Sequence, residues 1–554
     1  MIAHELNGRD YAEMIGVGAR HLKRFVNEVN DLNVFPIPDG DTGDNMMMTL
    51  RGGADVEIND TESISEAAEK VAKGMLLNAR GNSGVILSQF FAGIADGFEG
   101  LDIADTRALE EAFKSGVKRA YDSVMTPTEG TILTVAKDAT NGACEAGCEE
   151  PDEFMEHFVD SAKQSLERTP DLLHVLKEAG VVDSGGAGLV YIAEGMANYL
   201  TGEYDETDVA FDEKETKKSV SLDLDAFGPE SELQFGYCTE TLLRLQSSKC
   251  DYENFDVNII RDFLQSIGNS IVCIKDGSIV KMHVHTMTPY KVLEFCQQYG
   301  EFLTIKIENM MLQHNNLETG AASESDKDLT PKKRSKFGIV AVANGEGIKD
   351  DFINMGVDEV IFGGQTMNPS AENFIQSFDR VNADDIFVLP NNGNILMAAS
   401  QAASLYEKSN VHVIPTHSIG DAYAILGMLD MDGATPSEIE ESMKASMEGV
   451  ETAEISKSIR DASLNGIDIK EGEYIGILKK EVVSSKEELI DAAKETIDRL
   501  NLKNHDILLI IRGKGCDESV SNALASYAKS INSCIETVES DGKQDVYQFL
   551  LVAE

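Results

Sequence analysis

The spacing of the apolar residues changes along the 554-residue chain, and this change restricts the folds that the chain can adopt. From Tyr11 to about Leu200, apolar side chains such as Met14, Ile15 and Leu22 recur at every third or fourth position. This period is typical of amphipathic helices. Short glycine-rich turns separate the helical stretches, and no run of alternating strands interrupts them. The first region therefore predicts an all-α domain with functional loops at the helix ends.

Further along the chain the pattern becomes a mixture of strands and helices. Residues 233–316 read in the order β-α-β-β-α-β, which predicts an α+β ferredoxin-like sandwich. Beyond a polar segment, short apolar strands alternate with helices, as in a parallel sheet. We therefore expect a helical domain at 1–202, a linker at 203–232, an α+β middle domain at 233–316, a linker at 317–336 and an α/β domain at 337–554.

The charge of the chain limits its partners. Asp and Glu number 96 and Lys and Arg 48, which gives a net charge of −48. Such a surface repels phosphate backbones, so we expect no nucleic-acid partner. No apolar run reaches the roughly 18–20 residues that cross a bilayer, and the first residues lack the features of a signal peptide. With eight scattered cysteines, the sequence predicts a cytoplasmic protein without a transmembrane segment.

An acidic loop is the most informative motif. Residues 33–46 read NVFPIPDGDTGDNM, in which Asp39, Asp41 and Asp44 fall within six residues. Three like charges this close repel one another unless cations neutralise them, and hard oxygen ligands suit Mg²⁺. Because Mg²⁺ completes its shell with water and substrate phosphates, the loop indicates a metal–nucleotide site. An ordinary acidic turn or a Ca²⁺ loop is the alternative, although the EF-hand pattern is not met.

Three glycine-rich turns accompany the acidic loop: residues 80–84 (RGNSG), 129–131 (EGT) and 183–188 (DSGGAG). Each places small residues and hydroxyl groups where a helix begins, and unpaired N–H groups at such a point attract phosphate. None matches the P-loop or the dinucleotide-binding fingerprint. Each could be a helix cap alone, but three of them beside an aspartate cluster favour a nucleotide site.

These motifs resemble the nucleotide-binding domain of dihydroxyacetone kinases of the DhaL type, through residues 33–46, 79–84 and 176–186. Residues 235–240, 363–369 and 389–392 are similar to the catalytic subunit of bacterial fatty-acid kinase, in which middle and DegV-like domains follow the DhaL domain. The resemblance covers essentially the whole chain. It implies an N-terminal helical barrel that holds ATP and two Mg²⁺ ions at one end, a DegV-like C-terminal domain and a homodimer.

The resemblance also implies roles for individual residues. Asp39, Asp41 and Asp44 would form the catalytic centre and hold the Mg²⁺ ions. The ATP-binding residues would be Thr42, Gly43, Asn45, Asn82, Ser83, Gly84, Thr131 and Gly185. The implied reaction is phosphorylation of a fatty-acid carboxylate, delivered by a separate DegV-type fatty-acid-binding protein, to give an acyl phosphate. A carboxylate is already ionised at neutral pH, so positioning and charge neutralisation suffice without a general base.

The middle domain carries a candidate zinc site. His283 and His285 alternate on a predicted strand, so they share one face, and Cys238 lies on another strand of the domain. Cys and His are ligands that Zn²⁺ prefers, and Glu240 or water could complete the set. Two exposed histidines and a buried cysteine would give the same pattern. The resemblance includes a metal site at these positions and therefore favours Zn²⁺.

The role of the C-terminal domain and the acceptor are less constrained. Residues 415–420 (PTHSIG) depart from the Pro-Gln-Gly wording expected there, so we expect a docking or structural role for this domain. Because the nucleotide motifs do not identify the acceptor, a kinase for another small hydroxy compound, such as a glycerone-like polyol, is an alternative. A non-enzymatic, lipid-linked regulatory scaffold is a further one, against which the intact aspartate cluster argues.

Overall fold

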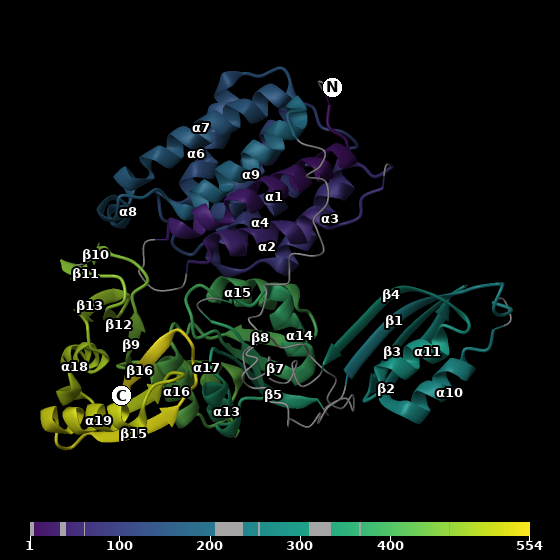
Figure 1. Cartoon of the computed structure of the whole chain (residues 1–554). Helices are drawn as coiled ribbons and strands as arrows, with labels where there is room; N and C mark the ends of the chain where they lie inside the picture. The colour runs from purple at the N-terminus through teal and green to yellow at the C-terminus, as the bar shows by residue number, and fades with distance from the viewer. Residues whose placement is uncertain are drawn as a thin grey trace. The chain divides into compact units, whose positions relative to one another are not determined.

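The computed structural model describes residues 5–33, 40–59, 61–204, 237–252, 255–276, 278–309, 334–364, 367–431, 433–464 and 466–554. The chain divides into two compact units, one of Met1–Phe211 with Pro331–Glu554 and one of Asp212–Thr330 (Figure 1). Most of the two predicted linkers, together with Asp39, lies outside the described residues. Among the helices that are described, none has both the length and the apolar character to span a membrane.

The N-terminal region is helical, as predicted. Its helices are α1 (Gly8–Asp31), α2 (Thr42–Ala54), α3 (Ile64–Asn78), α4 (Gly81–Gly97), α5 (Thr106–Asp122), α6 (Ile132–Ala146), α7 (Pro151–Leu172), α8 (His174–Ala179) and α9 (Ser184–Thr201). Helix α3 begins with a capping box, in which the Ser63 and Glu66 side chains each accept from the other residue's backbone N–H.

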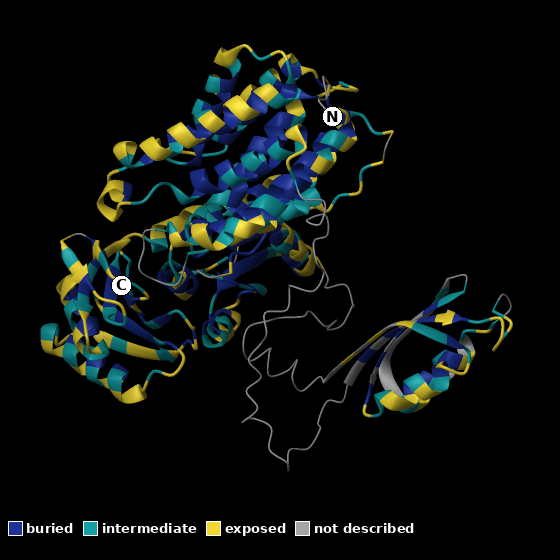
Figure 2. Ribbon diagram, turned by 45° about the horizontal axis from the view of Figure 1, so that its top comes forward, coloured by how far each residue is buried: buried dark blue, intermediate teal, exposed yellow. Residues whose placement is uncertain are grey.

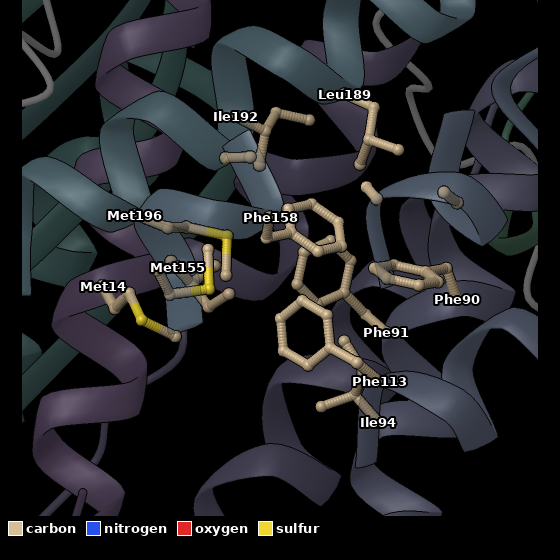
Figure 3. Packing of buried hydrophobic residues seen from close by; sticks show 14 of the residues in the cluster. Met14, Phe90, Phe91, Ile94, Phe113, Met155, Phe158, Leu189, Ile192 and Met196 are labelled. Carbon is tan, nitrogen blue, oxygen red and sulfur yellow. The ribbon is translucent and has the colours of Figure 1, made fainter. Parts of the chain in front are cut away.

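A single apolar core holds these helices together. Phe113 contacts Phe90 and Phe158 edge to face, with ring centroids 5.8 and 5.1 Å apart, an arrangement that aromatic quadrupoles favour (Figure 3). Figure 2 shows the buried residues of the helices on their inner sides and the exposed ones on their outer sides. The period of three to four residues in the sequence is thus the core stripe of each helix.

Glycines set how closely some of these helices approach. A Cβ atom on Gly195 of α9 would lie 2.7 Å from the Cα of Gly18 in α1, and a Cβ on Gly18 would lie 3.0 Å from the carbonyl oxygen of Ile192. Helices α1 and α9 therefore pack backbone to backbone at this point. The same two helices carry residues of the candidate site at their ends.

Over its described residues, the middle unit is a four-stranded sheet with two helices. Its elements are β1 (Tyr237–Leu245), α10 (Asn258–Ile267), β2 (Gly268–Asp276), β3 (Ile279–Thr286), α11 (Pro289–Cys296) and β4 (Gly300–Asn309). The strand order is β2-β3-β1-β4 and every neighbouring pair is antiparallel. This is the ferredoxin-like arrangement that the order of elements predicts.

The C-terminal region contains a parallel sheet and a larger mixed sheet. The parallel sheet has the order β6-β5-β7-β8 and the mixed sheet the order β13-β12-β9-β16-β14-β15, with a separate hairpin of β10 and β11. The strands are β5 (Ser335–Ala343), β6 (Glu359–Phe362), β7 (Ala383–Leu389), β8 (Asn410–Val413), β9 (Glu451–Lys457), β10 (Ala462–Leu464), β11 (Ile467–Ile469), β12 (Tyr474–Leu478), β13 (Glu481–Lys486), β14 (Ile507–Arg512), β15 (Glu536–Asp541) and β16 (Tyr547–Ala553).

Helices cover these two sheets. They are α13 (Glu346–Asn354), α14 (Ala371–Val381), α15 (Leu396–Leu405), α16 (Ile419–Met428), α17 (Pro436–Ser446), α18 (Leu489–Arg499) and α19 (Glu518–Ile531), with a short 3₁₀ helix at Leu502–Asn504. The α/β prediction for this region is confirmed. Strands such as β15 escaped the sequence analysis because it reads ETVESD and is mostly exposed, so it has no apolar alternation.

The close contact between α1 and α9 gives a stability prediction. Gly195→Ala should lower the melting temperature of the full chain, because overpacking a tight contact costs typically about 1–3 kcal/mol. Gly427→Ala in α16 is the matched control, since no atom lies within 4 Å of a Cβ placed there. Alanine should stabilise that helix by up to about 1 kcal/mol. Thermal unfolding followed by circular dichroism compares the two, and equal melting temperatures would contradict the packing argument.

Candidate functional site

The acidic loop enters helix α2 with an unusual cap. Asp41 is the N-cap residue, yet its carboxylate makes no capping hydrogen bond to the helix. Asn30 at the end of α1 supplies the bond instead, because its Oδ1 accepts from the Gly43 N–H at 2.7 Å. The Nδ2 of the same side chain donates to Asp44 Oδ2 at 2.8 Å. The Asn30 amide thus caps the N-terminus of α2, and the carboxylates of Asp41 and Asp44 lie beside that N-terminus.

Helix α9 begins beside α2. The Ser184 hydroxyl lies 3.3 Å from both Asn33 Oδ1 and Thr42 Oγ1, and the Thr42 hydroxyl donates to Asn33 Oδ1 at 3.1 Å. The backbone of α9 packs closely against a side chain of α2, since a Cβ on Gly188 would lie 2.5 Å from Met46 Sδ. The end of α1 and the starts of α2 and α9 therefore form one cluster of small polar groups.

Asp183 joins α9 to α6. It is the N-cap residue of α9, and its Oδ2 accepts from the Gly186 N–H at 2.7 Å. Burial raises the pKa of Asp183 to about 6, against the opposing effect of backbone N–H groups of Gly186, Ile132 and Gly185. Ile132 is the first residue of α6. One carboxylate thus serves the starts of two helices, a role that the sequence motif did not reveal.

The RGNSG turn approaches α2 from another side. Gly81 has a φ of +57°, and a Cβ there would lie 2.7 Å from the Nδ2 of Asn45. The Arg80 N–H donates to Thr49 Oγ1 at 3.2 Å, and a Cβ on Gly84 would lie 2.3 Å from that hydroxyl oxygen. Glycine is required here both for the left-handed backbone and for the close approach. The start of α4 is thereby fixed against α2.

Most of the residues expected to hold ATP and metal lie in this arrangement. Thr42, Gly43, Asn45, Gly84 and Gly185 are buried at or near the starts of α2, α4 and α9. Asn82 and Ser83 are half-buried, and Thr131, the N-cap of α6, donates to the carbonyl of Thr128 at 2.8 Å. Asp39 lies outside the described residues. These assignments stay predictions of the sequence.

The chemistry of the donor set fits a divalent cation bound together with a phosphate chain. Asp41 and Asp44 offer hard oxygen ligands, and Mg²⁺ requires only one or two protein carboxylates when phosphates and water supply the rest. Among the described residues, no group of three or more His, Cys, Asp or Glu side chains could hold a metal by itself. The helix starts around the two carboxylates add positive dipole ends, which favour an anion.

Residues of the C-terminal region also reach this site. Asn368 Nδ2 donates to Asp41 Oδ2, and the Arg80 guanidinium donates to the carbonyl of Asn368 at 3.1 Å. Asn82 Nδ2 donates to Asn394 Oδ1 at 3.3 Å. Sequence reasoning missed Asn30, Arg80 and Asn368, because their roles depend on contacts with distant residues.

A pocket of about 590 Å³ lies in the C-terminal region itself. It is at the carboxyl ends of β5, β6 and β7, where open parallel sheets bind ligands. Gly363, Asn391 and Asn394 line one side, while His417 and Ser418 of the divergent PTHSIG segment line another. The His417 and Ser418 N–H groups both donate to Asp421, at 2.6 and 3.1 Å.

The zinc candidates can be located by strand register alone. In the pairing of β1 with β3, Cys238 is opposite His285 and Glu240 is opposite His283. Directly paired residues share a face of a sheet, so these four residues belong to one face. The opposite face carries Met282 and Val284, which are buried in the core with α10 and α11. The zinc assignment stays a prediction, since the structure does not describe these four side chains.

The raised pKa of Asp183 gives a pH-dependent prediction. Unfolded Asp has a pKa of about 3.9, so Asp183 stabilises the fold fully below about pH 4, and this contribution is lost as the pH rises through about 6. The melting temperature of the native protein relative to Asp183→Asn should therefore fall between about pH 4 and pH 6.5. Differential scanning fluorimetry at matched ionic strength measures this difference, and a difference that does not vary with pH would contradict the assignment.

Comparison with known proteins agrees with this organisation. Family models match residues 36–198 (DAK2 domain), 234–317 (FakA-like fatty acid kinase, middle domain) and 338–554 (FakA-like fatty acid kinase, C-terminal). Protein YloV of Bacillus subtilis is 38% identical over 567 residues, with 100% of each chain covered.

Two solved structures are also similar in part. The dihydroxyacetone kinase of C. freundii, in complex with AMP-PNP and Mg²⁺, is 20% identical with a TM-score of 0.27, over 34% of this chain and 33% of that chain. A DegV family protein from Thermus thermophilus, described for its fatty acid binding, is 13% identical with a TM-score of 0.30, over 39% of this chain and 99% of that chain. From the three family matches and the full-length identity to YloV, the chain belongs to the FakA-like fatty acid kinase family.

Proposed function

We propose that this protein transfers the γ-phosphoryl group of ATP to the carboxylate of a fatty acid, giving an acyl phosphate. The acyl substrate would be presented by a separate DegV-type fatty-acid-binding protein. Membership of the FakA-like fatty acid kinase family and the DAK2 domain support a kinase. The carboxylate acceptor, the acyl phosphate and the carrier go beyond these findings and are our proposal.

The cap of α2 is the observation that carries the proposal. An aspartate at an N-cap normally bonds its own helix, whereas Asn30 takes that role here and the Asp41 carboxylate does not. The N-terminus of α2 is therefore still capped, and the carboxylates lie at the positive end of the helix dipole. This arrangement suits a site in which Asp39, Asp41 and Asp44 hold Mg²⁺ against the phosphates of ATP.

The residues of this chain then position the reactants and neutralise charge. Mg²⁺ supplies the electrostatic stabilisation of the transferring phosphoryl group when bound. Backbone N–H groups at the starts of α2, α4 and α9 would face the phosphate oxygens, with Ser83 as a hydroxyl donor and Thr42 beside them. Because the acceptor is an ionised carboxylate, the site needs no general base, and we assign none.

The middle unit supports the proposed homodimer. Strand β4 is at the edge of its sheet, and Leu303, Ile305 and Ile307 on it are 46%, 50% and 39% exposed. An exposed apolar edge strand is a surface that soluble proteins usually cover. A second copy of the chain is the partner that we propose for it.

The function is tested by supplying the purified chain with ATP, Mg²⁺, oleate and the cognate carrier protein, and measuring acyl phosphate. Turnover with a small polyol but none with fatty acid would favour the alternative kinase. Equal ATP affinity with and without Mg²⁺ would favour the scaffold, because a degenerate site would no longer couple metal to nucleotide.

In that assay Asp41→Ala should lower the rate more than about 100-fold, because metal-ion stabilisation of a phosphoryl transition state contributes several kcal/mol. The fold should persist, since losing one loop carboxylate relieves repulsion. Asp55→Ala is the control: Asp55 is at the other end of α2, exposed and paired with Arg51 at 3.0 Å, and its loss changes the charge equally. Near-normal turnover of Asp41→Ala would remove Asp41 from the metal site.

We further propose that Cys238, His283 and His285 bind Zn²⁺ in the middle unit. His285→Ala should lower the zinc content of the purified protein, measured by elemental analysis. The control is His174→Ala, an exposed histidine in the helical region. Unchanged zinc stoichiometry in His285→Ala, or no zinc in the native protein, would reject the site.

A further inference from the structure

An asparagine from the C-terminal region contacts the acidic loop. Asn368 is 327 residues from Asp41 in sequence, and its Nδ2 donates to the Asp41 Oδ2. The side chain is almost completely buried, with 2% of its surface exposed. This loop residue therefore makes a buried contact between the C-terminal region and the helical region.

The structure around Asn368 fixes its position. Its carbonyl accepts from Arg80 Nη1 at 3.1 Å, and the Ala371 N–H donates to the carbonyl of Ala79 at 3.3 Å. Ser370 begins α14 with a capping box to Asn373. The loop that carries Asn368 is thus bonded to the turn that precedes α4 and anchored at the start of α14.

The apolar packing beneath this contact is continuous. Ala79 and Val85 of the helical region belong to the same buried cluster as Phe374 of α14 and Ala398 of α15. Arg460 holds the other end of the acidic loop, since its guanidinium donates to the carbonyls of Asp31, at 3.1 Å, and Asn33. The C-terminal region therefore contacts Asp31, Asn33 and Asp41.

The remaining atom of the Asn368 amide points to a ligand. Its Oδ1 is buried and has no hydrogen-bond partner among the described residues. A buried acceptor oxygen without a partner is one that a bound water or cation would satisfy.

We propose that Asn368 is a positioning residue of the kinase site, which holds the Asp41 carboxylate in the orientation that binds the divalent cation. This inference rests on the proposed function, because it requires the cation at Asp41. A carboxylate has two oxygens and about four lone pairs, so Asp41 can accept from Asn368 and bind a cation together. The hydrogen bond selects one orientation of Asp41 among its neighbouring like charges. The nucleotide site is consequently completed by the C-terminal region.

The test measures binding, without turnover. Isothermal titration calorimetry of AMP-PNP at increasing Mg²⁺ concentrations is performed on the full chain and on Asn368→Ala and Asn368→Leu. Loss of an outer hydrogen-bond partner of a metal ligand typically weakens metal binding about 10- to 100-fold, and we expect the Mg²⁺ requirement to rise by that factor. Leucine keeps the volume of the side chain, so agreement between the two variants separates the lost hydrogen bond from a cavity.

Gln401→Ala is the matched control. Gln401 belongs to α15 and also bonds the helical region, through the carbonyl of Leu76 and, at 2.9 Å, through Gln89 Nε2. This variant weakens the contact between the C-terminal and helical regions at a point away from the acidic loop. Its Mg²⁺ requirement should stay within about twofold of that of the native protein.

The outcomes separate the inference from the proposed function. An unchanged Mg²⁺ requirement in the Asn368 variants, or an equal rise in Gln401→Ala, would overturn the positioning role while Mg²⁺-dependent binding by the native protein still supports the kinase. Absence of Mg²⁺-dependent AMP-PNP binding in the native protein would overturn the proposed function, and this inference with it.

Discussion

The first backbone N–H groups of a helix need acceptors. In α2 the side chain that accepts from them decides whether the Asp41 carboxylate is used as a helix cap. Had Asp41 capped its own helix, its carboxylate would accept hydrogen bonds from the backbone N–H groups of Gly43 or Asp44. The Asn30 amide satisfies the Gly43 N–H and orients Asp44 with its other end. A neutral side chain thus caps the helix, and the carboxylates of Asp41 and Asp44 lie beside this cap.

The net charge of −48 does not exclude an anionic nucleotide. Repulsion from the surface charges is screened by salt, whereas the groups that contact the nucleotide act at short range. Surface charges are screened within about 10 Å at ordinary ionic strength. Within the proposed site, the groups nearest to a phosphate would be the N–H groups at the starts of α2, α4 and α9 and any cations bound by the aspartates. The acidic surface disfavours large polyanions, such as nucleic acids, without excluding a nucleotide bound through metal.

Two loops of the C-terminal region contribute both to the pocket and to the contacts with the helical region. Gly363 and Gly364 line the pocket a few residues before Asn368, which bonds Asp41. Asn394 lines the same pocket and accepts from Asn82. The docking or structural role expected for this region stays a prediction. These contacts connect the parallel sheet to the starts of α2 and α4.

The sequence by itself determined the local order of the molecule. The three- to four-residue period predicted the helices from Tyr11 onward, and the β-α-β-β-α-β order predicted the middle fold. Each element buries one face, and that face must repeat with the element's own period. The motifs around Asp41, Gly81 and Gly185 likewise indicated a nucleotide site, since glycine and carboxylate requirements are local.

Only the tertiary structure decided which distant groups contact these motifs. Asn30 as the cap of α2, Asp183 shared by α6 and α9, and Asn368 against Asp41 have no local pattern, since a polar side chain in a sequence does not reveal its partner. The exposed strand β15 was missed for a related reason: hydrogen bonds to β14 define it, while its side chains follow no apolar alternation. Periodicity reports what a segment buries, whereas a site depends on which segments the fold brings together.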